Sequence, residues 1–409
     1  MRALALAAAL ALTGPVAAQT LDDPEGTILG TGREDGSETG FRDWVTGFRA
    51  KALEAGVPAA TYDAAMRGAH YLPDVVARDR RQSEFTKTIW DYLDVAVSED
   101  RVALGKQALA KQADLLDRIE ARYGVDKEVV VAIWGLESAY GTWRGDVPTI
   151  SALATLAYDA RRASFFEGQL VQALKILDQA HVAPGAMVGS WAGAMGHTQF
   201  MPSSWAEFAQ DFDGDGRRDI WGDDPADALA STAHYLAKWG WQKDLPWGLE
   251  VKLPADFDYD QTTERVKKPV ADWRLLGVQP MAGGDLPEGP EASILLPAGH
   301  TGPAFLIFPN FQVIEHYNLA DAYVIAVGHL ADRLRGGPTI AAAWPRQWRA
   351  LTQDERKELQ ALLAAAGFDA GGVDGRIGPK TIAAVKAWQK AQGLTPDGYP
   401  SPDLLEKLR

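Results

Sequence analysis

The chain has 409 residues, of which 46% are hydrophobic and 23% are charged, and its formal net charge is −14. This length suits two or three domains, and the apolar content suffices for a sizeable core. The excess of acidic residues argues against nucleic acid or an anionic membrane surface as a partner. Because the chain has no cysteine, disulfides, thiolate metal sites and a cysteine nucleophile are excluded.

The N-terminus has the pattern of a secretory signal peptide over residues 1–18. A basic start at Arg2 is followed by an apolar run over residues 3–12 and by small residues that end at Ala18. The run is too short to span a bilayer, and no later segment is apolar without interruption for about 18 residues. Since a lipid anchor would need a cysteine at the cleavage site, we expect an exported protein without a membrane anchor. In a Gram-negative cell, its location would be the periplasm.

The next segments differ in composition and in the spacing of their apolar residues, and therefore in expected structure. Residues 19–40 are rich in Gly, Asp and Glu without periodicity, which predicts a flexible leader. Residues 41–243 place apolar residues at three- and four-residue spacing, which is typical of helices. Residues 245–311 set short alternating pieces among Pro and Gly, which favours strands. A helix is expected again at 319–335, and residues 336–348 have the composition of a linker.

Residues 349–409 are predicted to form a separate small domain. Short amphipathic helices are expected at 357–365 and 382–392. An Asp-Gly pair follows each of them and marks a tight turn.

Glu137 is the residue most indicative of chemistry. It follows the apolar run VVVAIWGL at residues 129–136 and is itself followed by Tyr140 and Gly141, so its carboxylate is poorly solvated. Poor solvation and the negative end of the helix macrodipole both disfavour the anion and raise the pKa. A protonated Glu near neutral pH is what a general acid needs. The alternative is a helix-end Glu on the solvent face.

Several motifs carry a family resemblance. The turn VDGRIGPKT at residues 373–381 and the helix AVKAWQ at residues 384–389 resemble the three-helix peptidoglycan-binding domain of many cell-wall enzymes. The larger part of the chain resembles the soluble lytic transglycosylases of the membrane-bound lytic transglycosylase B family, which have a lysozyme-like core. Its matching segments are IWGLESAYG at 133–141, SWAGAMGHTQFMPSS at 190–204 and EHYN at 315–318.

The resemblance implies a mainly α fold. A lysozyme-like catalytic core at 41–335 with a small β-rich insertion at about 245–311 is followed by a three-helix peptidoglycan-binding domain at 349–409. Such enzymes act on peptidoglycan glycan strands in cell-wall turnover and remodelling. They cleave the β-1,4 bond between N-acetylmuramic acid and N-acetylglucosamine without water and leave a 1,6-anhydromuramoyl end. The chain is thus expected to be a lyase that acts on a polysaccharide.

By the same resemblance, Glu137 is the sole catalytic acid and base. It would protonate the glycosidic oxygen and then accept the proton of the C6 hydroxyl that attacks C1. The substrate's 2-acetamido oxygen can stabilise the charge at C1, which removes the need for a second carboxylate. The residues expected to bind substrate are Ser190 at the acetamido group, Gln199 and Phe200 at a neighbouring sugar, and Tyr317, Asn318, Tyr235 and Tyr92 near the reacting centre.

The second motif also has a structural interpretation. Gly193 and Gly196 are expected to form a tight packing corner, so no ligand contact is assigned to them. The motif carries Trp191 and His197-Thr198 where relatives often carry Tyr and Tyr-Gly. We expect this departure to shift fine subsite preference and to leave the chemistry unchanged.

A calcium loop is a further hypothesis, at residues 211–219 (DFDGDGRRD). Carboxylates at EF-hand positions 1, 3, 5 and 9 and a Gly at position 6 match the first part of the loop. Gly222 stands where the bidentate Glu of position 12 is expected. The proposed ligands are Asp211, Asp213, Asp215, the Arg217 carbonyl and Asp227. The alternative is an Asp/Gly turn without metal, and the mechanism itself requires no cofactor.

Two rival functions stay open at this stage. A hydrolytic muramidase would use water as acceptor and would need a second carboxylate near Glu137, for which Asp146 and Asp159 are candidates by proximity in sequence. A non-catalytic scaffold would bind the cell wall through its tail alone. The motifs identify no protein partner of cell-wall synthesis or division.

Overall fold

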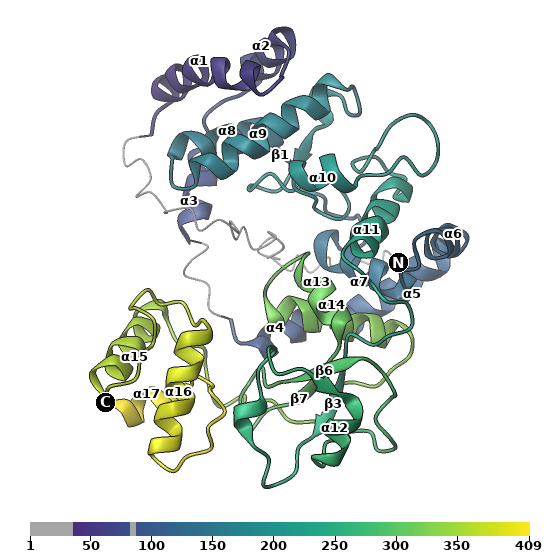
Figure 1. The fold of residues 1–409 in the computed structure, drawn as a ribbon. Coiled ribbons are helices and arrows are strands. Elements are labelled where there is room, and N and C mark those ends of the chain that lie inside the picture. The colour runs from purple at the N-terminus through teal and green to yellow at the C-terminus, as the bar shows by residue number, and fades with distance from the viewer. Residues whose placement is uncertain (1–35, 82–86) are drawn as a thin grey trace, which may run out of the picture.

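The computed structural model describes residues 36–81 and 87–409, and the fold is mainly helical, as predicted (Figure 1). The predicted signal peptide at 1–18 lies outside the described residues, as does most of the predicted leader at 19–40. Helix α1 begins at Glu38, inside that leader. The reason is a helix cap, because the Ser37 hydroxyl accepts a hydrogen bond from the Gly40 backbone N–H.

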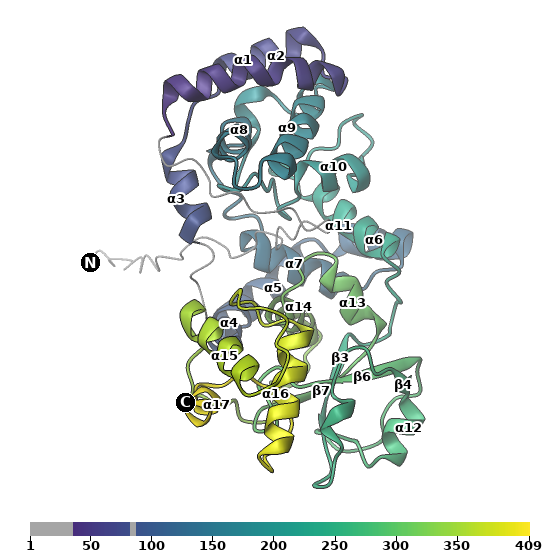
Figure 2. The same ribbon diagram turned by 60° about the vertical axis from the view of Figure 1, so that its left-hand side comes forward.

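One group of helices, at the top of Figures 1 and 2, is built around the antiparallel pair α8 and α9. Helices α1 and α2 pack across this pair, α3 contacts α8, and α10 contacts α9. The group comprises α1 (Glu38–Glu54), α2 (Ala59–Gly68), α3 (Pro73–Arg81), α8 (Thr149–Asp159), α9 (Ala163–Asp178), η2 (Pro184–Ala186) and α10 (Pro202–Phe208).

A second group of helices surrounds α7 (Lys127–Ser138) in the middle of the molecule. Every residue of α7 from Val129 to Ser138 is buried, which is the expected environment of a helix that is apolar on all sides. Helices α14, α5, α11 and α6 all contact α7. The remaining bounds are α4 (Ile89–Ala96), α5 (Glu99–Lys111), α6 (Ala113–Tyr123), α11 (Ala226–Lys238), α13 (Pro309–Glu315) and α14 (Asp321–Leu334).

The β-rich insertion is a five-stranded antiparallel sheet in the order β4-β6-β7-β3-β5. It has its own core, in which the Trp273 indole N–H donates to the Ala292 carbonyl at 2.8 Å. Helix α12 within this stretch was not predicted. The bounds are β3 (Gly248–Lys252), η3 (Tyr259–Gln261), β4 (Lys268–Pro269), α12 (Val270–Leu275), β5 (Gln279–Pro280), β6 (Glu291–Leu295) and β7 (Ala304–Ile307).

A separate two-stranded ribbon lies beside α8. It pairs β1 (Val147–Pro148) with β2 (Val188–Gly189) in antiparallel register. The ribbon matters for function because β2 leads directly into Ser190 and the second motif.

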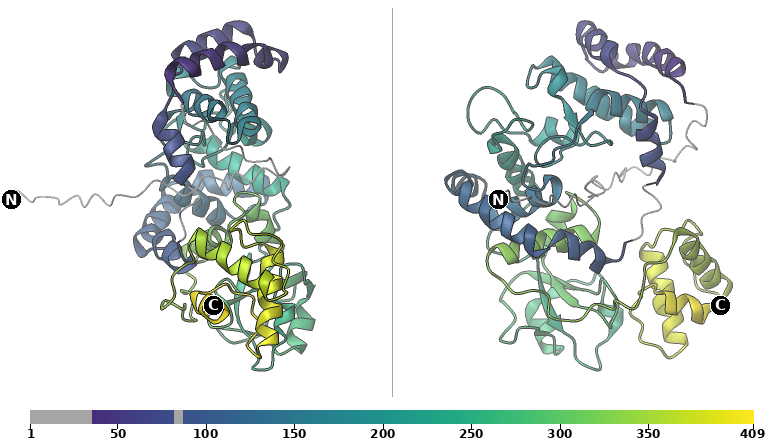
Figure 3. Two further views of the ribbon diagram at one scale, coloured as in Figure 1. Left: turned by 90° about the vertical axis from the view of Figure 1, so that its left-hand side faces the viewer. Right: turned by 180° about the vertical axis from the view of Figure 1, so that it is seen from behind.

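The tail forms three helices, α15 (Gln353–Ala365), α16 (Pro379–Ala391) and α17 (Pro402–Leu408), around their own core. Figures 2 and 3 show α16 beside the β-rich insertion. The ammonium group of Lys386 on α16 is buried there, and it donates to the Thr262 hydroxyl at 2.8 Å and to the Tyr259 carbonyl at 2.8 Å. The tail is therefore docked on the catalytic part.

The segment between the two parts is also held in place. The Glu250 carboxylate accepts hydrogen bonds from the Ala341 and Ala342 backbone N–H groups at 2.9 and 2.7 Å. Arg346 forms a two-bond ion pair with Asp94, with N–O distances of 2.7 and 2.8 Å. A segment with the composition of a linker is thus fixed along the surface.

Candidate active site

Glu137 lies in the last turn of α7, and its side chain is 2% exposed. The Tyr323 hydroxyl on α14 donates a hydrogen bond of 2.6 Å to Glu137 Oε1. Among the described residues, Oε2 has no hydrogen-bond partner. Burial raises the pKa of Glu137 well above its usual value of 4.5, and the Tyr323 hydrogen bond opposes this shift. This shift favours the protonated form of the carboxyl group, which is the form that a general acid needs.

Tyrosines surround this carboxyl group. Tyr323 stacks on Tyr317 with ring centroids 6.4 Å apart, and the Tyr317 hydroxyl donates to the Thr198 carbonyl at 2.5 Å. Burial raises the pKa of Tyr317 and Tyr323, and the negative charge of Glu137 raises them further. The same two causes, in the same order, raise the pKa of Tyr92. All three phenols therefore remain protonated, and Tyr323 is the one shown to donate to Glu137.

The second motif folds into a compact hairpin, in which Met195 pairs with both Gly189 and Phe200. The Ser190 hydroxyl accepts a hydrogen bond from the Ala194 backbone N–H at 3.1 Å. The Gln199 side chain is buried, and its amide donates to the Arg144 carbonyl at 3.1 Å and to the Gly196 carbonyl at 2.9 Å. Its Oε1 is buried and accepts no hydrogen bond from the described residues.

Phe200 is placed differently from the sugar contact predicted for it. Its ring is fully buried and lies 5.9 Å from the Tyr235 ring and 6.0 Å from the Tyr317 ring. The backbone pairing of Phe200 with Met195 turns the ring into the core, where it supports the two tyrosines. A side chain in this position packs against the two tyrosines of the site and does not face a sugar.

The other predicted residues lie in the same region. Tyr235 on α11 donates a hydrogen bond to the His316 carbonyl, directly before Tyr317. Asn318 is buried, and its side-chain oxygen accepts from the Ala320 backbone N–H at 3.0 Å.

The two glycines of the second motif have packing roles. A methyl group on Gly193 would lie 2.4 Å from the Leu153 side chain, and one on Gly196 would lie 2.3 Å from the Ile220 carbonyl. Both backbones also have positive φ, at 88° and 72°.

His197 and its partners were not predicted as functional residues. The Trp134 indole N–H donates to His197 Nδ1 at 3.1 Å, and His197 Nε2 lies 2.8 Å from the Gly222 carbonyl. This pattern fits a neutral ring that accepts at Nδ1 and donates at Nε2, and burial lowers the pKa of His197 accordingly. His197, which stands where relatives often carry another residue, therefore makes hydrogen bonds that join α7 to the loop before α11.

Tyr323 was also missed by sequence reasoning. It lies five residues after Asn318 in a segment predicted only as helix, and 186 positions from Glu137. Its nearness in sequence to the EHYN segment was the one signal that could have pointed to it.

A second group of carboxylates lies near the same segment. Oxygen atoms of Glu264, Glu315 and Asp321 are within 4.8 Å of one another. Burial, and then repulsion by Glu264 and Asp321, raise the pKa of Glu315 to about 8. Burial and Glu264 raise the pKa of Asp321 to about 7. In this cluster, Glu264 of the β-rich insertion lies close to the segment that carries Tyr317 and Tyr323.

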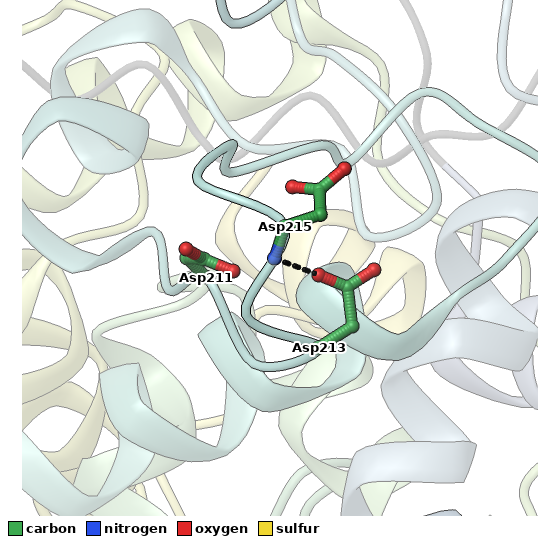
Figure 4. Close-up of side chains that lie close together, drawn as sticks. All are labelled: Asp211, Asp213 and Asp215. Carbon is green, nitrogen blue, oxygen red and sulfur yellow. Dashed lines mark hydrogen bonds between the residues drawn. The ribbon is translucent and has the colours of Figure 1, made fainter.

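The predicted calcium loop brings three exposed carboxylates together. Oxygens of Asp211, Asp213 and Asp215 lie within 4.8 Å of one another (Figure 4). The loop is closed by its own hydrogen bonds, such as that from the Asp215 backbone N–H to Asp213 Oδ1 at 3.0 Å. A set of carboxylate oxygens fits a hard cation such as calcium.

Asp227, the predicted closing ligand, lies outside this group of three. Its carboxylate accepts from the Phe212 backbone N–H at 2.7 Å and from the Asp219 backbone N–H at 2.8 Å. Both oxygens are thus used to hold the two ends of the loop together.

Comparison with known proteins agrees with this geometry. The family model of the transglycosylase SLT domain matches residues 40–332. The chain belongs to this family of lytic transglycosylases. The model of the putative peptidoglycan binding domain matches residues 352–408 of this transglycosylase.

Two kinds of relative are similar to this SLT-domain transglycosylase. Membrane-bound lytic murein transglycosylase B of Escherichia coli is 34% identical over 243 residues, which are 58% of this chain and 64% of the relative's own length. The crystal structure of SltB3 from Pseudomonas aeruginosa in complex with NAG-NAM-pentapeptide is 50% identical, with a TM-score of 0.88. That match covers 90% of this chain and 99% of SltB3.

A more distant solved structure is the Escherichia coli lytic transglycosylase Slt35 in complex with calcium. It is 28% identical, with a TM-score of 0.62, and the match covers 76% of this chain and 98% of Slt35. In the part of the transglycosylase that the structure describes, we find no helix that is both long and apolar enough to cross a membrane.

Proposed function

We propose that this chain cleaves the β-1,4 bond between N-acetylmuramic acid and N-acetylglucosamine in peptidoglycan and leaves a 1,6-anhydromuramoyl end. The observation that carries the proposal is Glu137, a buried carboxyl group with one hydrogen-bonded oxygen and a strongly raised pKa. The similarity to SltB3, which was crystallised with a NAG-NAM-pentapeptide, supports peptidoglycan as the substrate.

In the first step, Glu137 gives its proton to the glycosidic oxygen as the bond from that oxygen to C1 breaks. The Tyr323 hydrogen bond stabilises the carboxylate that results, because a donor to the charged form lowers its free energy. The acetamido oxygen of the substrate closes on C1 and carries the developing charge. Ser190 is proposed to orient this acetamido group.

In the second step, the oxygen of the C6 hydroxyl attacks C1, the bond from the acetamido oxygen to C1 breaks, and the hydroxyl proton passes to the Glu137 carboxylate. The acid is thereby restored, and no water is consumed. Because one carboxyl group serves both steps, a second catalytic carboxylate is not required.

The hydrolytic alternative lacks support from its two candidate carboxylates. Asp146 is exposed at the surface, and buried Asp159 is paired with Arg80 at 2.9 Å. Neither is among the groups that shift the pKa of Glu137.

The tail is proposed to bind the cell wall, as its match to the putative peptidoglycan binding domain suggests. We also propose that the protein is exported and acts in the periplasm. This follows from the signal pattern at residues 1–18 and from the location of the proposed substrate.

We propose that calcium binds the loop at 211–219 through Asp211, Asp213 and Asp215 and stabilises it. Asp227 closes the loop by accepting backbone hydrogen bonds. Calcium should therefore raise the unfolding temperature of the wild type and of Asp117→Asn, an exposed control, but not that of Asp213→Asn. An equal rise in all three proteins would place the ion elsewhere.

The test of the reaction is mass spectrometry of fragments released from purified peptidoglycan. Fragments lighter by one water than hydrolytic muropeptides would support the transglycosylase reaction, and Glu137→Gln should release none. Fragments with reducing muramoyl ends would identify water as the acceptor. Continued release by Glu137→Gln would show that another residue is the acid.

A further inference from the structure

The backbone directly after Glu137 has an unusual conformation. Ala139, Tyr140 and Gly141 have successive φ values of 48°, 60° and 80°. Only glycine adopts this left-handed region without steric cost, so Ala139 and Tyr140 are held there by surrounding contacts. The turn ends α7 two residues after the catalytic carboxyl group, and its position therefore affects where that group lies.

The Tyr140 side chain occupies a slot between α7 and α5 that two glycines create. A methyl group on Gly135 would lie 2.6 Å from the ring carbon that carries the Tyr140 hydroxyl. A methyl group on Gly105 of α5 would lie 2.5 Å from the hydroxyl oxygen itself. The Trp134 ring closes one side of the slot, edge-on at 5.9 Å.

Hydrogen bonds close a circuit around this slot. The Tyr140 hydroxyl donates to the Arg101 carbonyl of α5 at 2.8 Å, and the Arg101 guanidinium donates to the Gly135 carbonyl of α7. The Gly135 carbonyl also accepts from the Ala139 backbone N–H at 3.1 Å. The last turn of α7 is thereby tied to α5 through Tyr140.

The other side of the turn is tied to the second motif. The Ser138 hydroxyl donates to the His197 carbonyl at 2.5 Å and accepts from the Gly141 backbone N–H at 2.9 Å. Glu137 thus lies between two anchors, one at Tyr140 and one at Ser138.

We infer that Tyr140 is a positioning residue that holds the strained turn after α7 and thereby places the Glu137 carboxyl group against Tyr323. This inference rests on the proposed role of Glu137. Without Tyr140 in its slot, the left-handed turn loses its direct hydrogen bond to α5 and relaxes. Relaxation would move the carboxyl group off the Tyr323 hydroxyl and admit water to it.

Water at Glu137 would remove the burial that raises its pKa. The acid would then lose its proton at lower pH. A misplaced acid also acts less well on a substrate that still binds, so kcat should fall while KM changes little.

The experiment compares Tyr140→Phe and Tyr140→Ala with Tyr62→Phe. Tyr62 is a matched control, since its buried hydroxyl also donates to a backbone carbonyl of another helix, that of Val45, at 2.6 Å. It lies on α2, which is at the top of the molecule, whereas α7 is in the middle (Figures 1 and 2). Each protein is assayed on soluble glycan strands, and the Glu137 carboxyl carbon is titrated by NMR, with Glu137→Gln to assign the signal.

We expect kcat to fall about tenfold in Tyr140→Phe and about 100-fold in Tyr140→Ala, with KM within about twofold of the wild type. The pKa of Glu137 should fall in Tyr140→Ala and stay unchanged in Tyr62→Phe. Gly135→Ala should lower kcat alone but cost nothing further in the Tyr140→Ala background, because the methyl group then meets an empty slot.

Tyr140 variants that lose thermal stability but keep both kcat and the Glu137 pKa would overturn the inference and leave Tyr140 a purely structural residue. The NMR titration needs no turnover. A lowered Glu137 pKa in Tyr140→Ala would therefore support the positioning role even if the wild type released no anhydro product, in which case only the proposed reaction would fail.

Discussion

Replacing Tyr323 with Phe tests the electrostatic account of Glu137 directly. The substitution removes the hydroxyl that donates to Glu137 Oε1 and keeps the ring that stacks on Tyr317. The hydrogen bond is stronger to the carboxylate than to the neutral acid, so its loss should raise the pKa of Glu137 further.

The size of the shift follows from the strength of such bonds. A hydrogen bond to a charged group contributes about 1.5–3 kcal/mol, and one pKa unit corresponds to about 1.4 kcal/mol. We therefore expect the pKa of Glu137 to rise by about 1–2 units. Because the carboxylate forms as the proton leaves, kcat at the pH optimum should also fall, by about 10- to 100-fold.

The assay is the pH dependence of kcat on soluble glycan strands. The first step needs protonated Glu137, so the rate of the wild type falls as pH rises through its pKa. In Tyr323→Phe this basic limb should move to higher pH, whereas in Tyr62→Phe it should not move. A limb that stays in place, or moves to lower pH, would refute the role assigned to the Tyr323 hydrogen bond.

Three further predictions concern stability and docking. The folded-state pKa of Glu137 lies above its unfolded value, so the folded protein loses stability as pH rises from about 4.5. In urea unfolding, Glu137→Gln should therefore be at least about 1 kcal/mol more stable than the wild type at pH 7 and equal to it at pH 4. The same sign holds for Glu315, whose folded pKa of about 8 predicts that Glu315→Gln gains stability between about pH 4.5 and 8. No gain at pH 8 would show that the pKa of Glu315 is not raised by its burial and its acidic neighbours. Lys386→Met removes the buried hydrogen bonds to Thr262 and should weaken docking of the tail by about 2 kcal/mol. The weaker docking should be measured as faster proteolysis within residues 336–348. An unchanged cleavage rate would show that other contacts hold the tail.

The buried state of Glu137 could be predicted because its causes are local in the chain. The apolar run before it and the turn after it are read from adjacent residues, and both raise the pKa wherever the helix packs. The mainly helical fold, the β-rich insertion and two helices of the tail follow from patterns of the same local kind. The third tail helix was expected from the family resemblance alone, and the structure confirms all of these elements.

The parts that sequence could not give depend on contacts between distant segments. Tyr323 reaches Glu137 only because α14 packs along α7. The direction of a side chain is equally hidden, since Phe200 lies in a recognised motif but points into the core. A residue type suited to a ligand can also have its atoms already engaged, as the oxygens of Asp227 are by backbone N–H groups.

The fixed tail has a consequence for how the protein would meet the cell wall. A module on a free tether raises the local concentration of the enzyme over every bond within reach of the tether. Here Lys386, Glu250 and Arg346 remove that freedom. If the tail binds peptidoglycan as proposed, it also sets the angle at which the glycan strand enters the active site. It then sets the distance between the bound part of the strand and the bond that is cleaved. In such a protein the distance between the wall-binding site and the catalytic site would be set by the fold and not by the length of a flexible linker.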